Sequence, residues 1–181
     1  EEYRLKRLKS FLDPWADPFN EGFQLTQALI AVGRGEWFGV GLGASVQKLF
    51  YLPEAHTDFI LAVIAEELGF FGVLLVIALF AWLVGCGLRI GLRALERGQR
   101  FGGYCAFGVS LMLAIQALVS IGVNLGVLPT KGLTLPLISS GGSSVLMTCA
   151  AIGLLARVSY ELTRAEDAAA QAVSSPESPG E

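Results

Sequence analysis

The residues best suited to chemistry form a polar segment, 53–58, which reads Pro-Glu-Ala-His-Thr-Asp and ends where a long apolar run begins. Its last residue, Asp58, is a carboxylate at an expected helix start and a candidate for acid–base chemistry. Thr57 or Asp58 could equally cap that helix, because the helix dipole stabilises negative charge at its N-terminus. A lone histidine such as His56 is more often structural than catalytic. The residues themselves leave the catalytic and capping interpretations of Asp58 open.

Two further acids, Glu66 and Glu67, follow about two helical turns later, at the edge of the apolar run. Ionised side chains at membrane depth are costly and usually mark a functional site or a polar cavity. We therefore expect polar groups to gather in the region that follows Asp58.

A second unusual segment, 129–144, mixes prolines, glycines and serines with apolar residues. Such a segment does not form one continuous lipid-facing helix, and irregular backbone at membrane depth is tolerated where it is buried in protein or lines a cavity. A helix beginning near Ser143 would point its positive end into that cavity and attract an anionic group such as a pyrophosphate, with Lys131 adding charge. The same composition also fits a helix interface packed through small residues. Both interpretations stay open.

The elements that must position these residues are three apolar helices. Uncharged runs occupy 68–88, 101–123 and 135–156, and a helix needs about 20 apolar residues to cross a bilayer. None of the runs has the polar face of a soluble amphipathic helix. The sequence therefore predicts an all-α membrane protein, a polytopic helical bundle with spans at about 59–88, 101–123 and 135–157.

Positive charge predicts the orientation of these spans. Lysine and arginine close to span ends mark the cytoplasmic side. Segment 1–58 and the connection 124–132 are then expected outside, and tail 161–181 inside, as a helical extension that frays into a disordered tail. The basic cluster Arg4–Lys9 is a counter-signal, but it lies far from the first span. The arginines that carry the argument are Arg89, Arg93, Arg97 and Arg100 between the first two spans, and Arg157 and Arg164 after the third.

Composition supports a membrane protein and excludes several other classes. Of the 181 residues, 53% are hydrophobic and 16% are charged, whereas soluble domains have about 25% charged residues. The net charge of −3 gives no indication of nucleic-acid binding. The three cysteines lie in apolar stretches without CxxC spacing, which favours small buried side chains over a metal site or disulfides. The abrupt start at Glu1 predicts a piece of a longer protein.

The expected outer segment, 1–58, contains short elements suited to a membrane surface. Residues 23–32 predict a short interfacial or re-entrant helix. The glycine-rich stretch 33–43 lacks the GK[ST] ending of a phosphate-binding loop, so we interpret it as flexible or closely packed backbone. Several aromatic residues suit an interfacial belt, namely Trp15, Trp37, Phe38 and Tyr51.

Three stretches carry a resemblance to a known family. They are GFQLTQALIAVGRGEWFGVGLG (22–43), VQKLFYLPEAHTDFILAVIAEELGFFG (46–72) and LPTKGLTLPLISSGGSS (128–144). Together they resemble the SEDS family of shape, elongation, division and sporulation proteins, and its cell-division members more than its elongation members. One departure is Ser140, where the family pattern has tyrosine, and we expect it to change packing rather than chemistry.

The resemblance implies a ten-span fold, of which this chain would carry the last three spans and the large extracytoplasmic loop. It implies polymerisation of lipid II into glycan strands at the outer face of the cytoplasmic (inner) membrane, at the division septum. The implied partners are a class B penicillin-binding protein transpeptidase of the FtsI type, other membrane proteins of the division machinery, and membrane lipid. The family's catalytic aspartate corresponds to Asp58.

The implied reaction needs a base and a way to stabilise a leaving pyrophosphate. A sugar 4-hydroxyl is a poor nucleophile, so Asp58 would act as general base, which is typically worth about 10²–10⁴-fold. A divalent cation, Mg²⁺ or Mn²⁺, is a candidate for neutralising the leaving group, and we assign no residue as a metal ligand. The candidate substrate contacts are Arg7, Gln24, Gln27, Lys48, His56, Lys131 and Ser143.

Two other functions remain possible from the sequence. Broken helices and acids within a membrane also suit a transporter, here a lipid II flippase, although its key groups would be expected nearer the midplane than Asp58. A non-catalytic scaffold of the division machinery is the third hypothesis, and it predicts that Asp58 can be replaced without loss of division.

Overall fold

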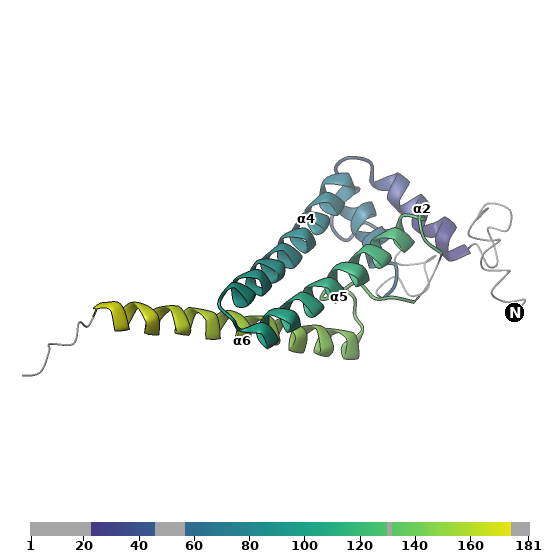
Figure 1. Cartoon of the computed structure of the whole chain (residues 1–181). Coiled ribbons are helices and arrows are strands. Elements are labelled where there is room, and N and C mark those ends of the chain that lie inside the picture. Colours follow the sequence, from purple (N-terminus) through teal and green to yellow (C-terminus); the bar gives the residue numbers. More distant parts are fainter. Residues whose placement is uncertain (1–22, 46–56, 130–131, 175–181) are drawn as a thin grey trace, which may run out of the picture.

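The computed structural model describes residues 23–45, 57–129 and 132–174. Within these ranges the chain is helical and contains no strand (Figure 1). Three of the helices are long and apolar enough to cross a membrane, which confirms the predicted all-α membrane class. The four helices are α2 (Phe23–Gly35), α4 (Ile60–Glu96), α5 (Arg100–Asn124) and α6 (Gly142–Ser174).

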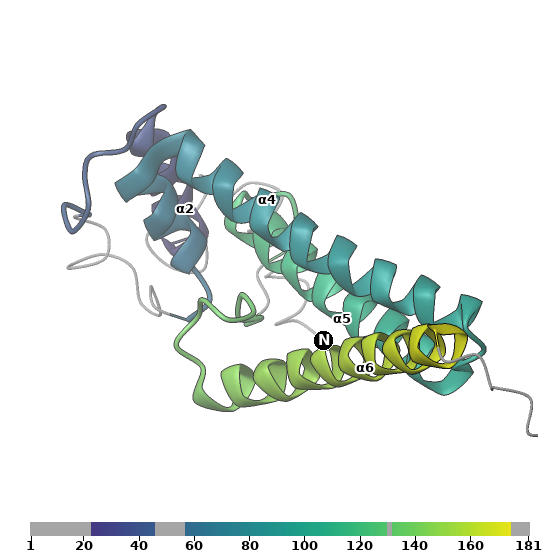
Figure 2. The same cartoon turned by 90° about the vertical axis from the view of Figure 1, so that its left-hand side faces the viewer.

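Helices α4 and α5 form an antiparallel pair that contains much of the buried core (Figures 1 and 2). Small residues bring the two backbones close together, as is typical of helices in membranes. A Cβ at Gly87 would lie 2.1 Å from Ser110 Oγ, and one at Gly91 would lie 3.2 Å from the carbonyl oxygen of Gly103. Helices α4 and α5 therefore pack through an interface of small residues.

Helix α4 is broken at Gly69, where φ is 68° and ψ is −162°, a conformation that favours glycine. Hydrogen bonds missing within α4 at the break are replaced by bonds to the turn that follows α2. Two carbonyls and two N–H groups of α4 are satisfied in this way, so the break leaves no gap in backbone pairing. The bonds run from Val40 N to Glu66 O (2.9 Å), Gly41 N to Glu67 O (3.1 Å), Phe70 N to Glu36 O (2.9 Å) and Phe71 N to Trp37 O (3.4 Å).

Helix α2 packs on the short first piece of α4 with its backbone almost in contact. A Cβ at Gly35 would lie only 1.8 Å from the carbonyl oxygen of Ala65. The apolar contact continues through Ala28 and Ala31 of α2, which pack against Phe59 and Val63. Glycine at position 35 therefore sets how closely α2 can approach α4.

Gly35→Ala is expected to destabilise the protein, and Gly33→Ala is its matched control. The two positions lie in the same helix, but a Cβ at Gly33 meets nothing within 4 Å. Overpacking at Gly35 should cost about 1–3 kcal/mol, whereas alanine at Gly33 should be neutral or add about 0.5–1 kcal/mol through helix propensity. Thermal unfolding of the purified full-length protein measures both. Equal midpoints for the two variants would contradict close packing at Gly35.

An aromatic cluster, defined as Trp37, Phe38, Phe70 and Phe71, surrounds the break. Its ring centroids lie 5.4–6.3 Å apart, and each side chain is more than half exposed. About 20 residues of α4 separate Gly69 from Arg89, a length of about 30 Å, which equals the thickness of a bilayer core. This spacing is the one expected if the cluster and Arg89 mark opposite membrane surfaces. Trp15 and Tyr51 lie outside the described residues.

Helix α6 meets the other helices at the end where the arginines gather, and its Gly142 end diverges from them (Figure 2). Val158 and Leu162 pack against Ala94, and Arg97 forms a 2.7 Å ion pair with Glu166. The arginines before α5 and those on α6 therefore lie at one end of the bundle, as predicted. We name it the arginine end, and the opposite end the Asp58 end.

The helix boundaries differ from the predicted spans in two places. Residues 132–141 are not helical, so the third helix begins at Gly142, next to the start predicted at Ser143. Residues 161–174 are helical rather than part of a disordered tail, because alanine, glutamate and arginine are strong helix formers even without a core to pack against. Residues 175–181 lie outside the described range.

Candidate functional site

Asp58 is half-buried and lies two residues before the first residue of α4. The N-cap position of α4 is Phe59, which makes no side-chain capping hydrogen bond. The N-cap position is thus one residue after Asp58 and two after Thr57, the two residues for which the sequence predicted it. Residues from α5 and from the segment before α6 surround Asp58.

Asn124, the last residue of α5, fixes the backbone around Asp58. It is fully buried, and its Nδ2 donates hydrogen bonds to the carbonyl oxygens of Asp58 and Ser120, both at 2.9 Å. Its Oδ1 accepts a hydrogen bond of 3.1 Å from the N–H of Ala62. One amide side chain thus joins the end of α5 to the start of α4, and it gives the Ala62 N–H a second acceptor besides the carbonyl oxygen of Phe59.

The irregular segment before α6 also fixes the backbone next to Asp58. Ser139 is buried, and its Oγ donates to the carbonyl oxygen of Thr57 at 2.6 Å while accepting from the N–H of Leu135 at 2.8 Å. Thr134 Oγ1 and Ser144 Oγ are joined by a 2.9 Å hydrogen bond, and Gln116 donates to the carbonyl oxygen of Thr134 at 3.2 Å. The segment is therefore tied to both α5 and α6, which explains how irregular backbone is tolerated here.

The carboxylate of Asp58 lies against the backbone of Gly132. A Cβ at Gly132 would be 3.1 Å from Asp58 Oδ2, so a side chain there would press on the carboxylate. Gly132 directly follows Lys131 in the sequence, and Lys131 lies outside the described residues. Two segments far apart in the chain, 57–58 and 132–139, thus meet at Asp58.

Glu66 belongs to a separate buried cluster. Its side chain has 0% exposure, Ser45 Oγ donates a hydrogen bond to Oε2, and Arg34 Nη1 lies 3.6 Å from Oε1. A buried carboxylate is tolerated when it is paired and hydrogen-bonded. Glu66 therefore joins α2 and the turn after it to α4, next to the break. The neighbouring Glu67 has a buried Oε1 without a hydrogen-bond partner.

The other predicted site residues fall into two groups. Gln24 is exposed and Gln27 is half-buried near the start of α2, and Ser143 is exposed in the first turn of α6. In the described part of the chain no hydrogen bond joins these three side chains to Asp58, and their role as substrate contacts stays a prediction. The remaining four, Arg7, Lys48, His56 and Lys131, lie outside the described residues.

Sequence reasoning did not identify Asn124 or Ser139 as residues that position Asp58. Asn124 ends an uncharged run of apolar residues, and a buried amide at such a place is a usable signal. Ser139 has no comparable signal, because it is one of several serines in its segment.

A metal site was tested against the residues that the structure describes. Across 23–45, 57–129 and 132–174, no three histidine, cysteine, aspartate or glutamate side chains are grouped to hold an ion. Mg²⁺ is commonly bound through one or two carboxylates together with substrate phosphates. Asp58 would then have to share such an ion with a pyrophosphate, and a divalent cation stays a proposal.

Known proteins were compared with this chain. Residues 1–164 match the FtsW/RodA/SpoVE family, described as "Cell cycle protein". A protein of Xanthomonas oryzae pv. oryzae named "Probable peptidoglycan glycosyltransferase FtsW" is 66% identical over 92% of this chain and 34% of its own length. A protein of the same name from Thioalkalivibrio sulfidiphilus is 64% identical over 88% of this chain and 40% of its own length.

The fold also has a solved counterpart. A structure described as "Structural coordination of polymerization and crosslinking by a peptidoglycan synthase complex" aligns with a TM-score of 0.68 and 32% identity, over 90% of this chain and 43% of the other. The chain thus spans between about one third and just over two fifths of the lengths of these proteins. Since the family match covers most of the chain, and the three spans and the segments around Asp58 lie within it, the chain belongs to the FtsW/RodA/SpoVE family of cell cycle proteins.

Proposed function

We propose that this chain supplies the catalytic carboxylate of a peptidoglycan glycosyltransferase that polymerises lipid II during cell division. The observation that carries the proposal is the position of Asp58. Its backbone is held by Asn124, the preceding carbonyl is held by Ser139, and its carboxylate lies against Gly132. Such fixation suits a group that must meet a reacting hydroxyl in one geometry. Names of relatives that are 64–66% identical support the reaction class.

In the proposed reaction, Asp58 acts as general base. The 4-hydroxyl of one lipid-linked disaccharide loses its proton to the Asp58 carboxylate as its oxygen forms a bond to the anomeric carbon of the other molecule. The bond from that carbon to the pyrophosphate breaks, and undecaprenyl pyrophosphate leaves. One carboxylate suffices for such a direct, inverting displacement, because pyrophosphate leaves without strong acid assistance.

The negative charge of the leaving group needs compensation from cations. Arg7, Lys48 and Lys131 are the proposed sources, and Lys131 directly precedes the glycine that Asp58 contacts. A Mg²⁺ or Mn²⁺ ion could supply the same charge when bound. Gln24, Gln27, His56 and Ser143 remain proposed contacts to the sugar or the diphosphate.

The proposed setting is the inner membrane at the division septum, with Asp58 on the periplasmic side. The arginine end would face the cytoplasm by the positive-inside rule. The proposed partner is a class B penicillin-binding protein of the FtsI type, together with other division membrane proteins. The likeness to a structure described as a peptidoglycan synthase complex supports a partner of this kind.

The test is to measure glycan polymer and lipid II translocation in the same vesicles, using the purified full-length protein with its partner transpeptidase. We expect polymer to form from lipid II that is already on the Asp58 side. Translocation without polymer would instead establish a flippase. The absence of both activities would favour a scaffold.

A further inference from the structure

An apolar groove of about 180 Å³ lies between the long piece of α4 and the irregular segment before α6. Three of its leucine and isoleucine side chains are 39–52% exposed, so the described residues leave the groove open. Every side chain that lines it is apolar, namely Val76, Leu79, Phe80 and Leu83 from α4, and Leu137 and Ile138 from the irregular segment.

The irregular segment connects this groove to the surroundings of Asp58. Gly132 lies against the Asp58 carboxylate, and Ser139 donates a hydrogen bond to the carbonyl oxygen of the residue before Asp58. Leu137 and Ile138 directly precede Ser139 in the sequence and line the groove. The groove and the surroundings of Asp58 are therefore built partly from the same segment.

The groove lies at the depth of the hydrocarbon core. The carbonyl oxygen of Thr134 accepts a hydrogen bond from Gln116, which lies about two helical turns, or roughly 12 Å, from Asn124 toward the arginine end. The α4 residues of the groove lie about 10 to 20 Å beyond the break at Gly69. An apolar chain in this groove would therefore lie beside the acyl chains of the bilayer.

Leu137 has a backbone conformation that is unfavourable for a side chain. Its φ is 65°, and a hydrogen bond from Ile138 N to Leu135 O closes a turn with Pro136 and Leu137 at its centre. Turns with positive φ at this position usually have glycine or asparagine there. Strained residues of this kind gather at ligand sites, where the surrounding structure holds them in place. Leucine here thus supplies a side chain to the groove at a conformational cost.

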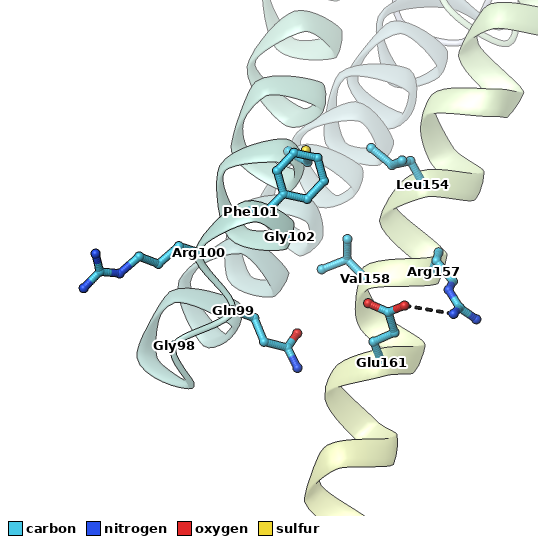
Figure 3. Close-up of a pocket in the computed structure, with 10 residues that line it drawn as sticks. Gly98, Gln99, Arg100, Phe101, Gly102, Leu154, Arg157, Val158 and Glu161 are labelled. Carbon is cyan, nitrogen blue, oxygen red and sulfur yellow. Dashed lines mark ion pairs between the residues drawn. The ribbon is translucent and has the colours of Figure 1, made fainter.

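Two other cavities among the described helices do not adjoin Asp58. A cavity of about 640 Å³ lies between the turn at Gln99 and Glu161 of α6 (Figure 3). It is at the opposite end of α5 from Asn124, a distance of about 35 Å. A second groove, of about 200 Å³, is formed by α4 and α5 alone and includes no residue of the irregular segment.

The chemistry of the proposed reaction identifies an occupant for the groove at Leu137. The donor's pyrophosphate is attached to the carbon that the acceptor hydroxyl attacks, so it has to lie next to Asp58. The acceptor's own pyrophosphate is at the far end of its disaccharide. The donor's polyprenyl chain begins at the reacting pyrophosphate and has to enter hydrocarbon beside the site. Building on the proposed function, we propose that the groove holds the first isoprene units of the donor's polyprenyl chain.

The test is photocrosslinking of the full-length protein with its partner transpeptidase in phosphatidylcholine vesicles. The probe is a lipid II analogue with a diazirine in its first isoprene units and a blocked 4-hydroxyl, so that it binds only as donor. We expect mass spectrometry to find the label on 76–83 and 137–138, and excess unlabelled analogue to displace it. Because the readout is binding, a failure of Asp58 as base would leave this labelling intact.

Leu79→Trp and Leu74→Trp are matched variants of α4. Both leucines are about half exposed, but Leu79 lines the groove and Leu74 does not. Tryptophan at position 79 should fill the groove, reduce the labelling and raise the KM for lipid II about fivefold with little change in kcat. The factor is modest because a chain that leaves the bilayer gains packing contacts rather than escape from water. Leu74→Trp should leave the labelling and the KM unchanged.

Leu137→Gly separates a role in the groove from a role in the fold. Glycine adopts the positive φ without strain, so the thermal midpoint should not fall, while labelling should decrease and KM should rise. Unchanged labelling in both Leu79→Trp and Leu137→Gly would overturn the proposal. Equal displacement of the label by phosphatidylglycerol would also overturn it, in favour of ordinary acyl chains. Label found only outside the groove would overturn it as well, and would mean that other parts of the full-length protein cover this surface.

Discussion

Asp58→Asn is expected to lower the rate of glycan polymerisation by about 10²–10⁴-fold, the usual contribution of a general base. Asparagine has nearly the same shape and leaves the backbone bonds at Thr57 and Asp58 in place, but it cannot accept the proton of the attacking hydroxyl. Membrane insertion and partner binding should be retained. The measurement is polymer formed from lipid II by the purified full-length protein with its partner.

The matched control is Glu36→Gln, which removes another carboxylate in the described chain outside the membrane spans. Glu36 is exposed, and its backbone carbonyl, rather than its side chain, bonds to α4. This variant should polymerise at the normal rate. Near-normal polymer from Asp58→Asn would refute the assignment of Asp58 as base, and an equal loss in Glu36→Gln would point to overall charge instead.

Asn124→Leu should have the second largest effect, because it removes three hydrogen bonds with one side chain. The carbonyl of Asp58 loses the donor that Asn124 provides, and an unsatisfied buried polar group costs about 1–3 kcal/mol. We also expect a loss of about 10²-fold in polymerisation rate, since a displacement of about 1 Å at a reacting group can have that effect. The thermal midpoint and the rate well below that midpoint measure the two effects separately.

Gln116→Leu is the control for this variant, since it removes the same amide from the same helix. Gln116 donates a hydrogen bond to the carbonyl oxygen of Thr134 in the irregular segment, rather than to Asp58. Gln116→Leu should lower the thermal midpoint less than Asn124→Leu does and should keep most of the polymerisation rate. If Asn124→Leu lowers the midpoint but folded protein keeps its full rate, Asn124 supports the fold and does not position Asp58.

The parts of the structure that depend on local composition were predictable from sequence. The uncharged runs predicted the three spans, because a helix needs about 20 apolar residues to cross a bilayer. The prolines and glycines in 129–144 predicted an irregular segment, because they interrupt helices. The arginine positions predicted that the α4–α5 connection and the part of α6 after Arg157 lie at the same end of the bundle, and the Arg97–Glu166 ion pair confirms this. Asp58 could be identified as a candidate for the same reason, as an acid at the edge of an apolar run.

The parts that depend on contacts between distant segments were not predictable. The break at Gly69 has no distinguishing feature in the local sequence, since α4 contains other glycines. It is tolerated because the Glu36–Gly41 turn forms hydrogen bonds with the backbone groups that the break leaves unpaired. The bond from the Ala62 N–H to Asn124 was not predictable for the same reason, because Asn124 lies at the far end of α5. A helical extension after the third span was expected, but its reach to Ser174 was not, because disorder was predicted from low apolar content while helix propensity acted against it.

The break in α4 also affects how the protein can respond to membranes of different thickness. A straight helix of 37 residues would be about 55 Å long and would have to tilt strongly or project far beyond a hydrocarbon core of about 30 Å. The first piece of α4 instead leaves the axis of the long piece at Gly69 and is fastened to the end of α5 through Asn124 (Figure 2). A thicker or thinner bilayer can therefore tilt the long piece of α4 while Asp58 keeps its register with α5.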